Sequence, residues 1–261
     1  MAEPLPGGRV TAPLLSLAGV WKSFGGLRAV QDVGFDVPRG SLTALIGPNG
    51  AGKTTLFALM SGFIVPDAGT VRFDGRDITG QPPHLNARAG MTRTFQIVQP
   101  FAAQTVRENI AVGAHLHEPR RAAALQQAEQ VAQRVGLAPL LDQPAGELTV
   151  AGRKRLELAR ALATRPKLLL LDEVLAGLNP QEIAEMIPVV RGLVDSAEGR
   201  LTVLMIEHVM QAVMNLAEHV WVLAQGRLIA AGTPAQVTAD ERVIEAYLGR
   251  GSAARLRAGQ P

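Results

Sequence analysis

Hydrophobic residues along this chain fall into two patterns, short continuous runs and longer stretches with helical spacing. Apolar runs of about four to eight residues bounded by glycine, proline or charge predict buried strands, whereas apolar residues at i, i+3 and i+4 predict helices. Strands are predicted within residues 14–24, 29–40, 41–47, 167–173, 201–208 and 219–232, the last range holding two. Helices are predicted within residues 53–63, 179–197 and 234–249. This alternation indicates an α/β protein with a mostly parallel sheet.

Two segments interrupt the alternation. Residues 69–80 are predicted to form a β-hairpin around Asp74-Gly75, because this dipeptide adopts the positive φ angles of a tight two-residue turn. Residues from about 98 to 163 are rich in Ala, Gln and Leu with helical spacing, and are predicted to form an inserted helical subdomain. The predicted organisation is a flexible N-terminal arm at 1–13, a single domain at 14–250 and a flexible tail at 251–261.

Composition narrows the classes of function. Of the 261 residues, 47% are hydrophobic and 19% are charged, which suits a sizeable core. The formal charge of +3 is too small for a polybasic nucleic-acid-binding protein, so no nucleic acid partner is expected. The absence of cysteine excludes disulfides, zinc–thiolate sites and thiol nucleophiles. No signal peptide and no apolar run of the roughly 18–20 residues needed to span a bilayer are recognised, so any membrane role is expected to act through a partner.

The segment GPNGAGKT at residues 47–54 matches the phosphate-binding pattern G-x-x-x-x-G-K-[ST] in full. Its glycines let consecutive backbone N–H groups surround a phosphate, Lys53 reaches the β- and γ-phosphates, and the Thr54 hydroxyl is a hard oxygen ligand for magnesium. A glycine-rich surface turn is the alternative, but an apolar strand before the motif and a helix after it favour nucleotide binding. The predicted ATP-binding residues are Gly47, Pro48, Asn49, Gly50, Ala51, Gly52, Lys53, Thr54 and Thr55.

An acidic pair ends the apolar run LLLLDE. Asp172 and Glu173 are expected at the carboxyl end of a buried strand, where ligands bind in open α/β sheets. Asp172 is then suited to holding magnesium and Glu173 to polarising an attacking water. Acidic residues also end buried strands without any function. The phosphate-binding motif in the same chain favours the catalytic interpretation.

Three single residues are further candidates. His208 ends another apolar strand, where an imidazole can contact a γ-phosphate, but a lone histidine is more often a surface or packing residue. Gln96 lies where the sheet is predicted to give way to the helical segment, and by itself is more simply a turn residue. Phe24 precedes two glycines and can stack on a nucleobase, although packing in a hairpin is the ordinary role.

In chain order these pieces resemble the nucleotide-binding subunit of ATP-binding-cassette (ABC) transporters, over roughly Leu14 to Gly249. The resemblance implies a P-loop NTPase fold of the ABC type, with an N-terminal antiparallel β subdomain and an inserted α-helical subdomain. It also implies that Gln96 senses magnesium and water and couples to a partner. His208 would act as a γ-phosphate switch, and Phe24 would stack on adenine. Lys53, Glu173 and His208 are the implied catalytic residues, and Thr54, Gln96 and Asp172 the implied metal ligands.

The segment ELTVAGRKRLELARAL, Glu147–Leu162, aligns with the signature of that family, usually LSGGQ. The aligned residues are Leu148, Thr149, Val150, Ala151 and Gly152. Ala151 stands where the second glycine is expected and Gly152 where the glutamine is expected. In the family this loop faces the ATP held by a second subunit, so its role here is expected to be in trans.

Three cations, Arg153, Lys154 and Arg155, crowd the first turn of the helix predicted after Gly152. The positive end of the helix dipole disfavours cations there by roughly 0.3–1 kcal/mol each. A γ-phosphate across a dimer interface would explain them. The alternative is that they point away, into solvent or an acidic patch, with Glu157 offsetting one.

Two more departures lie after the acidic pair. Ala176-Gly177-Leu178-Asn179 stands where the family has SALD, and Asn179 would hydrogen-bond across the dimer without charge. Val174 stands where proline is common. Neither changes Lys53, Asp172 or Glu173, so ATP hydrolysis is expected to be retained.

RTFQ, LELARAL, IEH and IEAYLG look most like the ATPases of branched-chain amino acid importers. The resemblance implies ATP and Mg²⁺, a homo- or heterodimer with a second ABC ATPase subunit, transmembrane permease subunits and, indirectly, a periplasmic solute-binding protein. It implies a peripheral location on the cytoplasmic face of the inner membrane and a coupling surface near Gln96–Asn109. The alternatives are a urea importer or lipopolysaccharide exporter, a soluble ABC ATPase, and a regulatory module that binds nucleotide without turnover.

Overall fold

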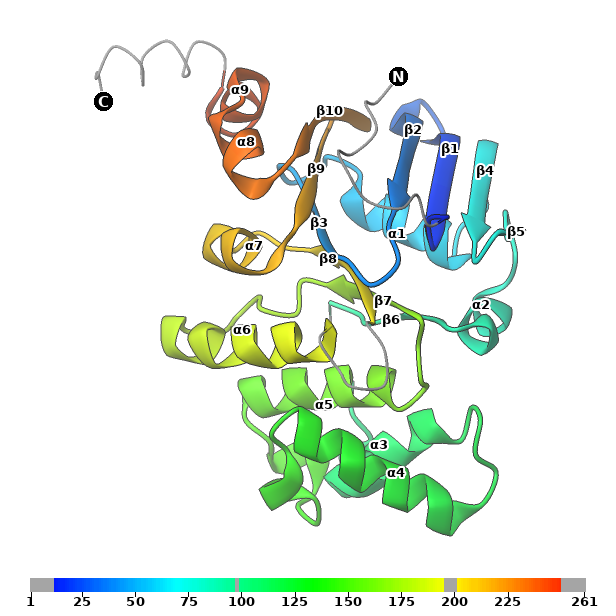
Figure 1. The fold of residues 1–261 in the computed structure, drawn as a ribbon, viewed down its shortest axis with the longest axis vertical. Helices are drawn as coiled ribbons and strands as arrows, with labels where there is room; N and C mark the ends of the chain where they lie inside the picture. Colours follow the sequence, from blue (N-terminus) through cyan, green and yellow to red (C-terminus); the bar gives the residue numbers. More distant parts are fainter. Residues whose placement is uncertain (1–11, 97–98, 195–200, 250–261) are drawn as a thin grey trace.

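The computed structural model describes residues 12–96, 99–194 and 201–249 of the chain (Figure 1). The predicted arm at 1–13 falls almost wholly outside these ranges, and the predicted tail at 251–261 lies outside them completely. Among the helices within these ranges, none has the length and hydrophobicity needed to cross a bilayer.

A six-stranded sheet forms the centre of the molecule. Its strand order is β10-β9-β3-β8-β7-β6, and every neighbouring pair is parallel except β10 with β9. The strands are β3 (Leu42–Ile46), β6 (Met91–Arg93), β7 (Leu168–Asp172), β8 (Thr202–Ile206), β9 (His219–Ala224) and β10 (Arg227–Gly232). All residues of β3, β7 and β8 are buried, because helices or a second sheet cover both faces. This double burial explains why these strands are uninterrupted apolar runs in the sequence.

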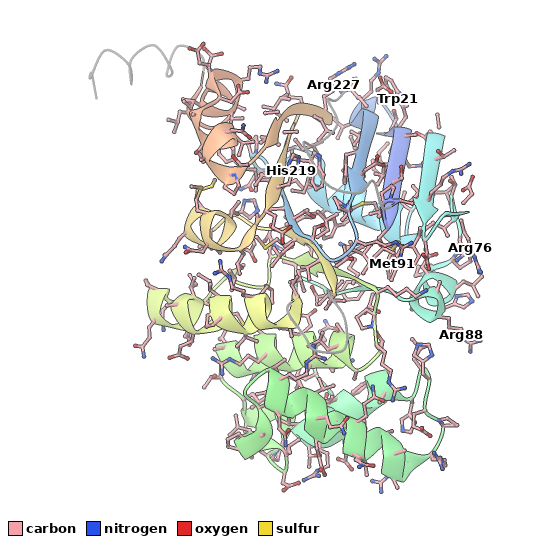
Figure 2. The ribbon with its side chains drawn as sticks, viewed as in Figure 1. Trp21, Arg76, Arg88, Met91, His219 and Arg227 are labelled. Carbon is pink, nitrogen blue, oxygen red and sulfur yellow. The ribbon has the colours of Figure 1, made fainter. Side chains whose placement is uncertain are left out.

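A second, antiparallel sheet of order β2-β1-β4-β5 packs beside the first (Figure 1). Its strands are β1 (Leu15–Phe24), β2 (Leu27–Val37), β4 (Ala68–Phe73) and β5 (Arg76–Asp77). The predicted turn joins β4 to β5, with φ angles of 52° at Asp74 and 76° at Gly75. Figure 2 shows Arg227 of β10 near Trp21 of β1, where the guanidinium carbon lies 6.0 Å from the ring centroid.

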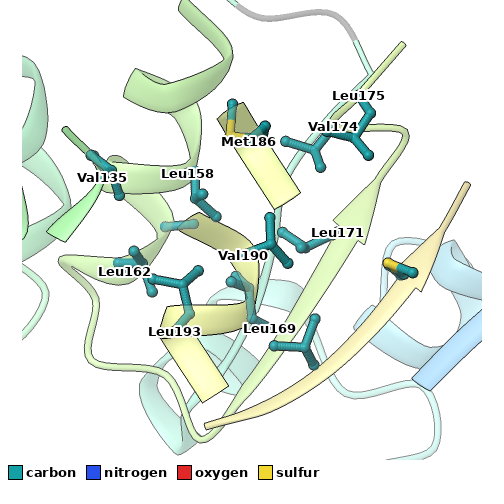
Figure 3. Packing of buried hydrophobic residues seen from close by; sticks show 14 of the residues in the cluster. Val135, Leu158, Leu162, Leu169, Leu171, Val174, Leu175, Met186, Val190 and Leu193 are labelled. Atoms are coloured by element: carbon teal, nitrogen blue, oxygen red, sulfur yellow. The ribbon is translucent and has the colours of Figure 1, made fainter. Parts of the chain in front are cut away.

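Helices cover both faces of the parallel sheet. On one face, the core contains α1 (Lys53–Ser61) and residues of the antiparallel sheet. On the other face lie α6 (Pro180–Val194), α7 (Met210–Leu216), α8 (Pro234–Ala239) and α9 (Glu241–Leu248). Figure 3 shows how side chains of α5 and α6 pack against β7, through Leu158, Leu162, Met186, Val190, Leu193, Leu169 and Leu171.

The chain between β6 and β7 forms a helical block, seen at the lower end of Figure 1. Its elements are α3 (Val106–Ala114), α4 (Arg121–Arg134), α5 (Val150–Leu162) and two 3₁₀ turns, η1 (Ala138–Leu140) and η2 (Ala145–Glu147). Thr105 and Glu108 form a capping box that starts α3, since each side chain satisfies the other's backbone N–H. The block lies against the edge of the sheet from which it is inserted.

The structure differs from the sequence expectation at several short elements. Helices α2 (Pro83–Ala89) and α7 and strand β6 are absent from the prediction, because each is too short to show a clear period. The single helix predicted at 234–249 is wrong. Asp240 separates α8 from α9, and its side chain accepts the N–H of Arg242 as an N-cap. Likewise α5 begins at Val150 rather than after Gly152, since Thr149 caps it.

The turn at Asp74 generates a test of the fold. Its carboxylate accepts hydrogen bonds from Lys167 (2.7 Å) and Arg39, which lower the pKa of Asp74 to about 2. We expect Asp74→Asn to lower the unfolding free energy by less than about 1 kcal/mol, because the pairs are partly exposed and screened. A carboxylate whose pKa is lower in the folded state stabilises only while ionised, so this difference should shrink as the pH falls below about 4.

Urea unfolding at about pH 7 and about pH 3 measures the Asp74 effect. Equal differences between wild type and Asp74→Asn at the two pH values would contradict the assignment of the two ion pairs.

Candidate nucleotide site

The phosphate-binding motif connects the buried strand β3 to the start of α1. Gly47 has φ 150°, and a Cβ there would lie 2.0 Å from the carbonyl oxygen of Leu223. Gly52 has φ 103°, and a Cβ there would lie 2.3 Å from the carbonyl oxygen of Ala29. A side chain cannot be accommodated at Gly47 or Gly52, because the backbones of β9 and β2 contact the loop at these two positions.

Lys53 is the first residue of α1 and its side chain is buried. Its Nζ donates to the carbonyl oxygens of Gly47 at 2.7 Å and Pro48 at 3.1 Å. Burial lowers the pKa of Lys53, and the negative charges of Glu173 and Asp172 oppose this effect. The ammonium group thus lies directly on the loop that would hold phosphate.

A cavity of about 840 Å³ lies above this loop. It brings together the loop, Phe24, Gln96, Glu173 and His208, which are far apart in the sequence. Phe24 is 47% exposed at the end of β1, so its ring is accessible from the cavity. The cavity is also lined by Arg28, Gln31 and Gln225, for which the sequence gives no functional signal.

Glu173 is the centre of this arrangement. Its Oε1 lies 2.5 Å from Nε2 of His208, and its Oε2 accepts a hydrogen bond of 2.8 Å from Nε2 of Gln96. The residue has φ 52°, a left-handed conformation that is strained for a side chain other than glycine. Its N–H donates to the carbonyl oxygen of Ile206 at 3.0 Å, which ties it to β8. Gln96, Glu173 and His208 belong to separate motifs in the sequence. In the structure the Glu173 carboxylate contacts the other two side chains.

Asp172 does not line the first cavity. Its Oδ2 lies 2.6 Å from Nη2 of Arg93 in a buried ion pair, and its N–H donates to the Thr94 hydroxyl at 3.0 Å. The Arg93 guanidinium also lies over three phenylalanine rings, with centroid distances between 5.5 and 5.9 Å, those of Phe57, Phe63 and Phe95. The sequence analysis missed Arg93. Its signal is a cation three residues before Gln96, at the end of the unrecognised strand β6.

The metal ligands implied by the sequence are near one another. Thr54, Gln96 and Asp172 all line a second cavity, of about 630 Å³, beside the first. Their hydroxyl, amide and carboxylate oxygens are the hard donors that Mg²⁺ prefers, so the residues fit this ion. Within residues 12–96, 99–194 and 201–249 there is no cluster of three or more His, Cys, Asp or Glu able to hold a metal.

The three cations of α5 have partners within the chain. Arg153 donates to the carbonyl oxygen of Gly146 at 2.8 Å, and Arg155 forms an ion pair of 3.2 Å with Glu185. Lys154 is buried and donates to the carbonyl oxygen of Glu173 at 3.2 Å. Hence Lys154 is the cation that reaches the site in its own chain, a contact that the sequence analysis did not predict.

The signature segment and Asn179 line neither cavity. Leu148 is buried and Thr149 caps α5 by accepting the N–H of Gly152 at 3.1 Å, whereas Val150 is exposed. The Asn179 side chain accepts the N–H of Glu182 at 3.0 Å and caps α6. These residues, together with Ala151, are therefore not part of the site formed by their own chain.

Comparison with known proteins identifies the family to which this chain belongs. A family model described as ABC transporter matches residues 30–176, which is more than half of the chain, and one described as Branched-chain amino acid ATP-binding cassette transporter matches residues 227–253. The chain is 39% identical over 255 residues to the high-affinity branched-chain amino acid transport ATP-binding protein BraF of Pseudomonas aeruginosa, covering 92% of this chain and 99% of that protein. The same values hold for LivG of Escherichia coli strain K12.

Solved structures agree with these relatives. A nucleotide-free ATP-binding cassette from an ABC transporter superposes with a TM-score of 0.82 at 32% identity, covering 92% of this chain and 100% of that chain. An ATP-binding cassette in its ADP conformation gives a TM-score of 0.82 at 33% identity with the same coverage. The α/β fold class predicted from the sequence is thereby confirmed. The chain belongs to the ABC transporter family and is one of its ATP-binding cassettes.

Proposed function

We propose that this chain hydrolyses ATP at Glu173 to energise the import of branched-chain amino acids or a similar small polar solute. The observation that carries the hydrolytic part is the position of the Glu173 carboxylate between His208 and Gln96, in one cavity with the phosphate loop. The solute class rests on the relatives BraF and LivG and on the match at the carboxyl end of the chain.

Each residue has a distinct role in the proposed reaction. Phe24 stacks on the adenine ring, and the backbone N–H groups of residues 49–55 surround the β-phosphate. Lys53 stabilises the charge on the β- and γ-phosphates. Glu173 accepts a proton from the water that attacks the γ-phosphorus, while His208 and Gln96 hold its two oxygens. Magnesium would supply further neutralisation of phosphate charge, and Thr54, Gln96 and Asp172 would hold it.

We further propose that the working unit is a homo- or heterodimer. The residues from Leu148 to Gly152 lie at the N-terminal end of α5, outside both cavities of their own chain. A helix N-terminus presents N–H groups that suit a phosphate, so this segment is available to the nucleotide of a second subunit. Asn179 would contribute a polar contact across the same interface.

The proposed membrane partners are transmembrane permease subunits, with a periplasmic solute-binding protein acting through them. The second cavity opens between β6 and the helical block and is lined by Phe95 and Val112, both of them exposed hydrophobic residues. Phe101 is exposed nearby, with its ring centroid 5.1 Å from the guanidinium carbon of Arg160. This surface would keep the chain at the cytoplasmic face of the inner membrane.

The proposed base is tested with Glu173→Gln. An amide cannot accept the proton of water, so we expect turnover to fall by roughly a hundredfold or more, with ATP binding and ATP-dependent dimerisation retained. ATPase assays and size-exclusion chromatography with ATP measure the two effects. Glu129→Gln, on α4 and away from the site, serves as a control with unchanged turnover. Wild-type hydrolysis by Glu173→Gln would overturn the assignment.

The phosphate loop is tested with Lys53→Ala. Loss of the charged hydrogen bonds should weaken binding of a fluorescent ATP analogue by roughly ten- to a hundredfold. Lys167→Ala removes a lysine that pairs with Asp74 outside the site, and should leave the affinity unchanged. Retained affinity in Lys53→Ala would mean that the loop does not hold the phosphates.

The transport assignment is tested by co-purification. Tagged Glu173→Gln, expressed in the native cell and solubilised gently with ATP, should bring down a permease with several membrane spans and a periplasmic amino-acid-binding protein. A urea-binding protein or lipopolysaccharide-export components would instead identify one of the alternative ABC systems. Recovery of soluble partners alone would contradict the transporter role and leave the ATPase activity intact.

A further inference from the structure

Lys154 occupies an unfavourable position for a cation. It is the fifth residue of α5, just past the first turn at the positive end of the helix dipole, and only 6% of it is exposed. Burial of an ammonium group is costly unless polar groups replace its water. Its Nζ donates to the carbonyl oxygens of Glu173 at 3.2 Å and Gln96 at 3.4 Å. The lysine therefore holds the backbone of the two residues whose side chains also contact each other.

Glu207 lies on the other side of the same contact. It follows β8 directly, precedes His208 and is 1% exposed. Its Oε1 accepts the N–H of Leu175 at 3.0 Å. One buried carboxylate thus joins the loop after Glu173 to the turn that carries the histidine.

The charge of Lys154 also affects the pKa of Glu207. Burial raises the pKa of Glu207 to about 7, and hydrogen bonding from backbone N–H groups partly opposes this. The negative charge of Glu173 raises the pKa of Glu207 further, while the positive charge of Lys154 lowers it. His208 is the neighbouring titratable group on the same turn. Asp172, paired in register with Ile206, forms an ion pair with Arg93.

We propose that Lys154 and Glu207 are a pair of positioning residues for the Glu173 carboxylate, beyond the roles that the family resemblance implies. Lys154 holds the carbonyl groups of Gln96 and Glu173, and Glu207 holds the N–H of Leu175. These three groups flank the contact of the Glu173 side chain with those of Gln96 and His208. Glu173 has a strained backbone, so its carboxylate keeps its direction only while neighbouring groups hold the loop. Lys154 belongs to α5 of the helical block, and Glu207 directly follows β8 of the sheet.

This inference rests on the proposed role of Glu173 as the base. Neither positioning residue lines the nucleotide cavity, so the pair is expected to affect the chemical step and not ATP binding. A displacement of about 1 Å at a reacting group is enough for a loss of roughly a hundredfold. The predicted signature is a lower kcat at nearly constant KM.

The test compares Lys154→Met and Glu207→Gln with wild type. Both variants should keep cooperative thermal unfolding, with kcat at least about tenfold lower and KM for ATP changed less than about twofold. Lys154→Arg should recover most of the kcat lost in Lys154→Met, because it keeps a buried cation. The double variant should be no worse than the more damaging single variant, since the two residues hold one structure. Arg134→Met, on the exposed end of α4, should be unchanged.

The pH profile adds a readout that general destabilisation would not produce. Burial raises the pKa of Glu207 to about 7, so the ratio of the kcat values of wild type and Glu207→Gln should change across this pH, and taking the ratio removes any group that titrates in both proteins. If Lys154→Met does not fold, the kcat and KM of Glu207→Gln still decide the proposal, because a wild-type kcat in that variant would overturn it.

Two results distinguish a failure of the proposed positioning pair from a failure of the proposed catalytic base. Normal kcat in Lys154→Met and Glu207→Gln, with inactive Glu173→Gln, would remove only the positioning pair. Active Glu173→Gln would remove the proposed base itself. A loss of kcat accompanied by an equal rise in KM would also contradict the pair, since it would indicate a defect in nucleotide binding.

Discussion

The parallel alignment of β3, β8 and β7 is the constraint on which the rest of this cassette depends. Each strand ends in a functional segment, the phosphate loop after β3, His208 after β8 and Asp172-Glu173 at the end of β7. Neighbouring parallel strands place their carboxyl ends at one edge of the sheet, so three segments that lie far apart in the sequence converge there. The contacts of Glu173 with Gln96 and His208 follow from this convergence.

Buried charge is concentrated where the sheet meets the helical block. Arg93 pairs with Asp172, Lys154 binds backbone carbonyls, and Glu157 accepts the N–H of Phe95. Each of these side chains has a polar partner, as burial of a charged or polar group requires, although Nε of Arg93 is buried without a hydrogen bond. We expect a layer of this kind to make the relative position of sheet and block more specific than apolar packing alone would.

The structure identifies the partners of the three cations of α5, which the sequence left open. Of the two explanations considered for them, neither a nucleotide across a dimer nor open solvent is needed for Lys154, which is used inside its own chain. Arg155 pairs with an acidic residue of α6, as the second explanation expected, and Arg153 binds a backbone carbonyl. Local electrostatics predicted that the cations need partners but did not identify them.

The sequence by itself determined the fold class, the long elements, the Asp74-Gly75 turn and the phosphate loop, because these depend on local hydrophobic periodicity and backbone conformation. It also marked Glu173, His208 and Gln96 as candidates. Only the tertiary structure decided that these three touch, that Asp172 pairs with Arg93 and that Lys154 and Glu207 support the site. The short elements α2, β6 and α7 were likewise decided by packing. The physical reason is that contacts between distant segments depend on strand order and burial, which no local pattern records.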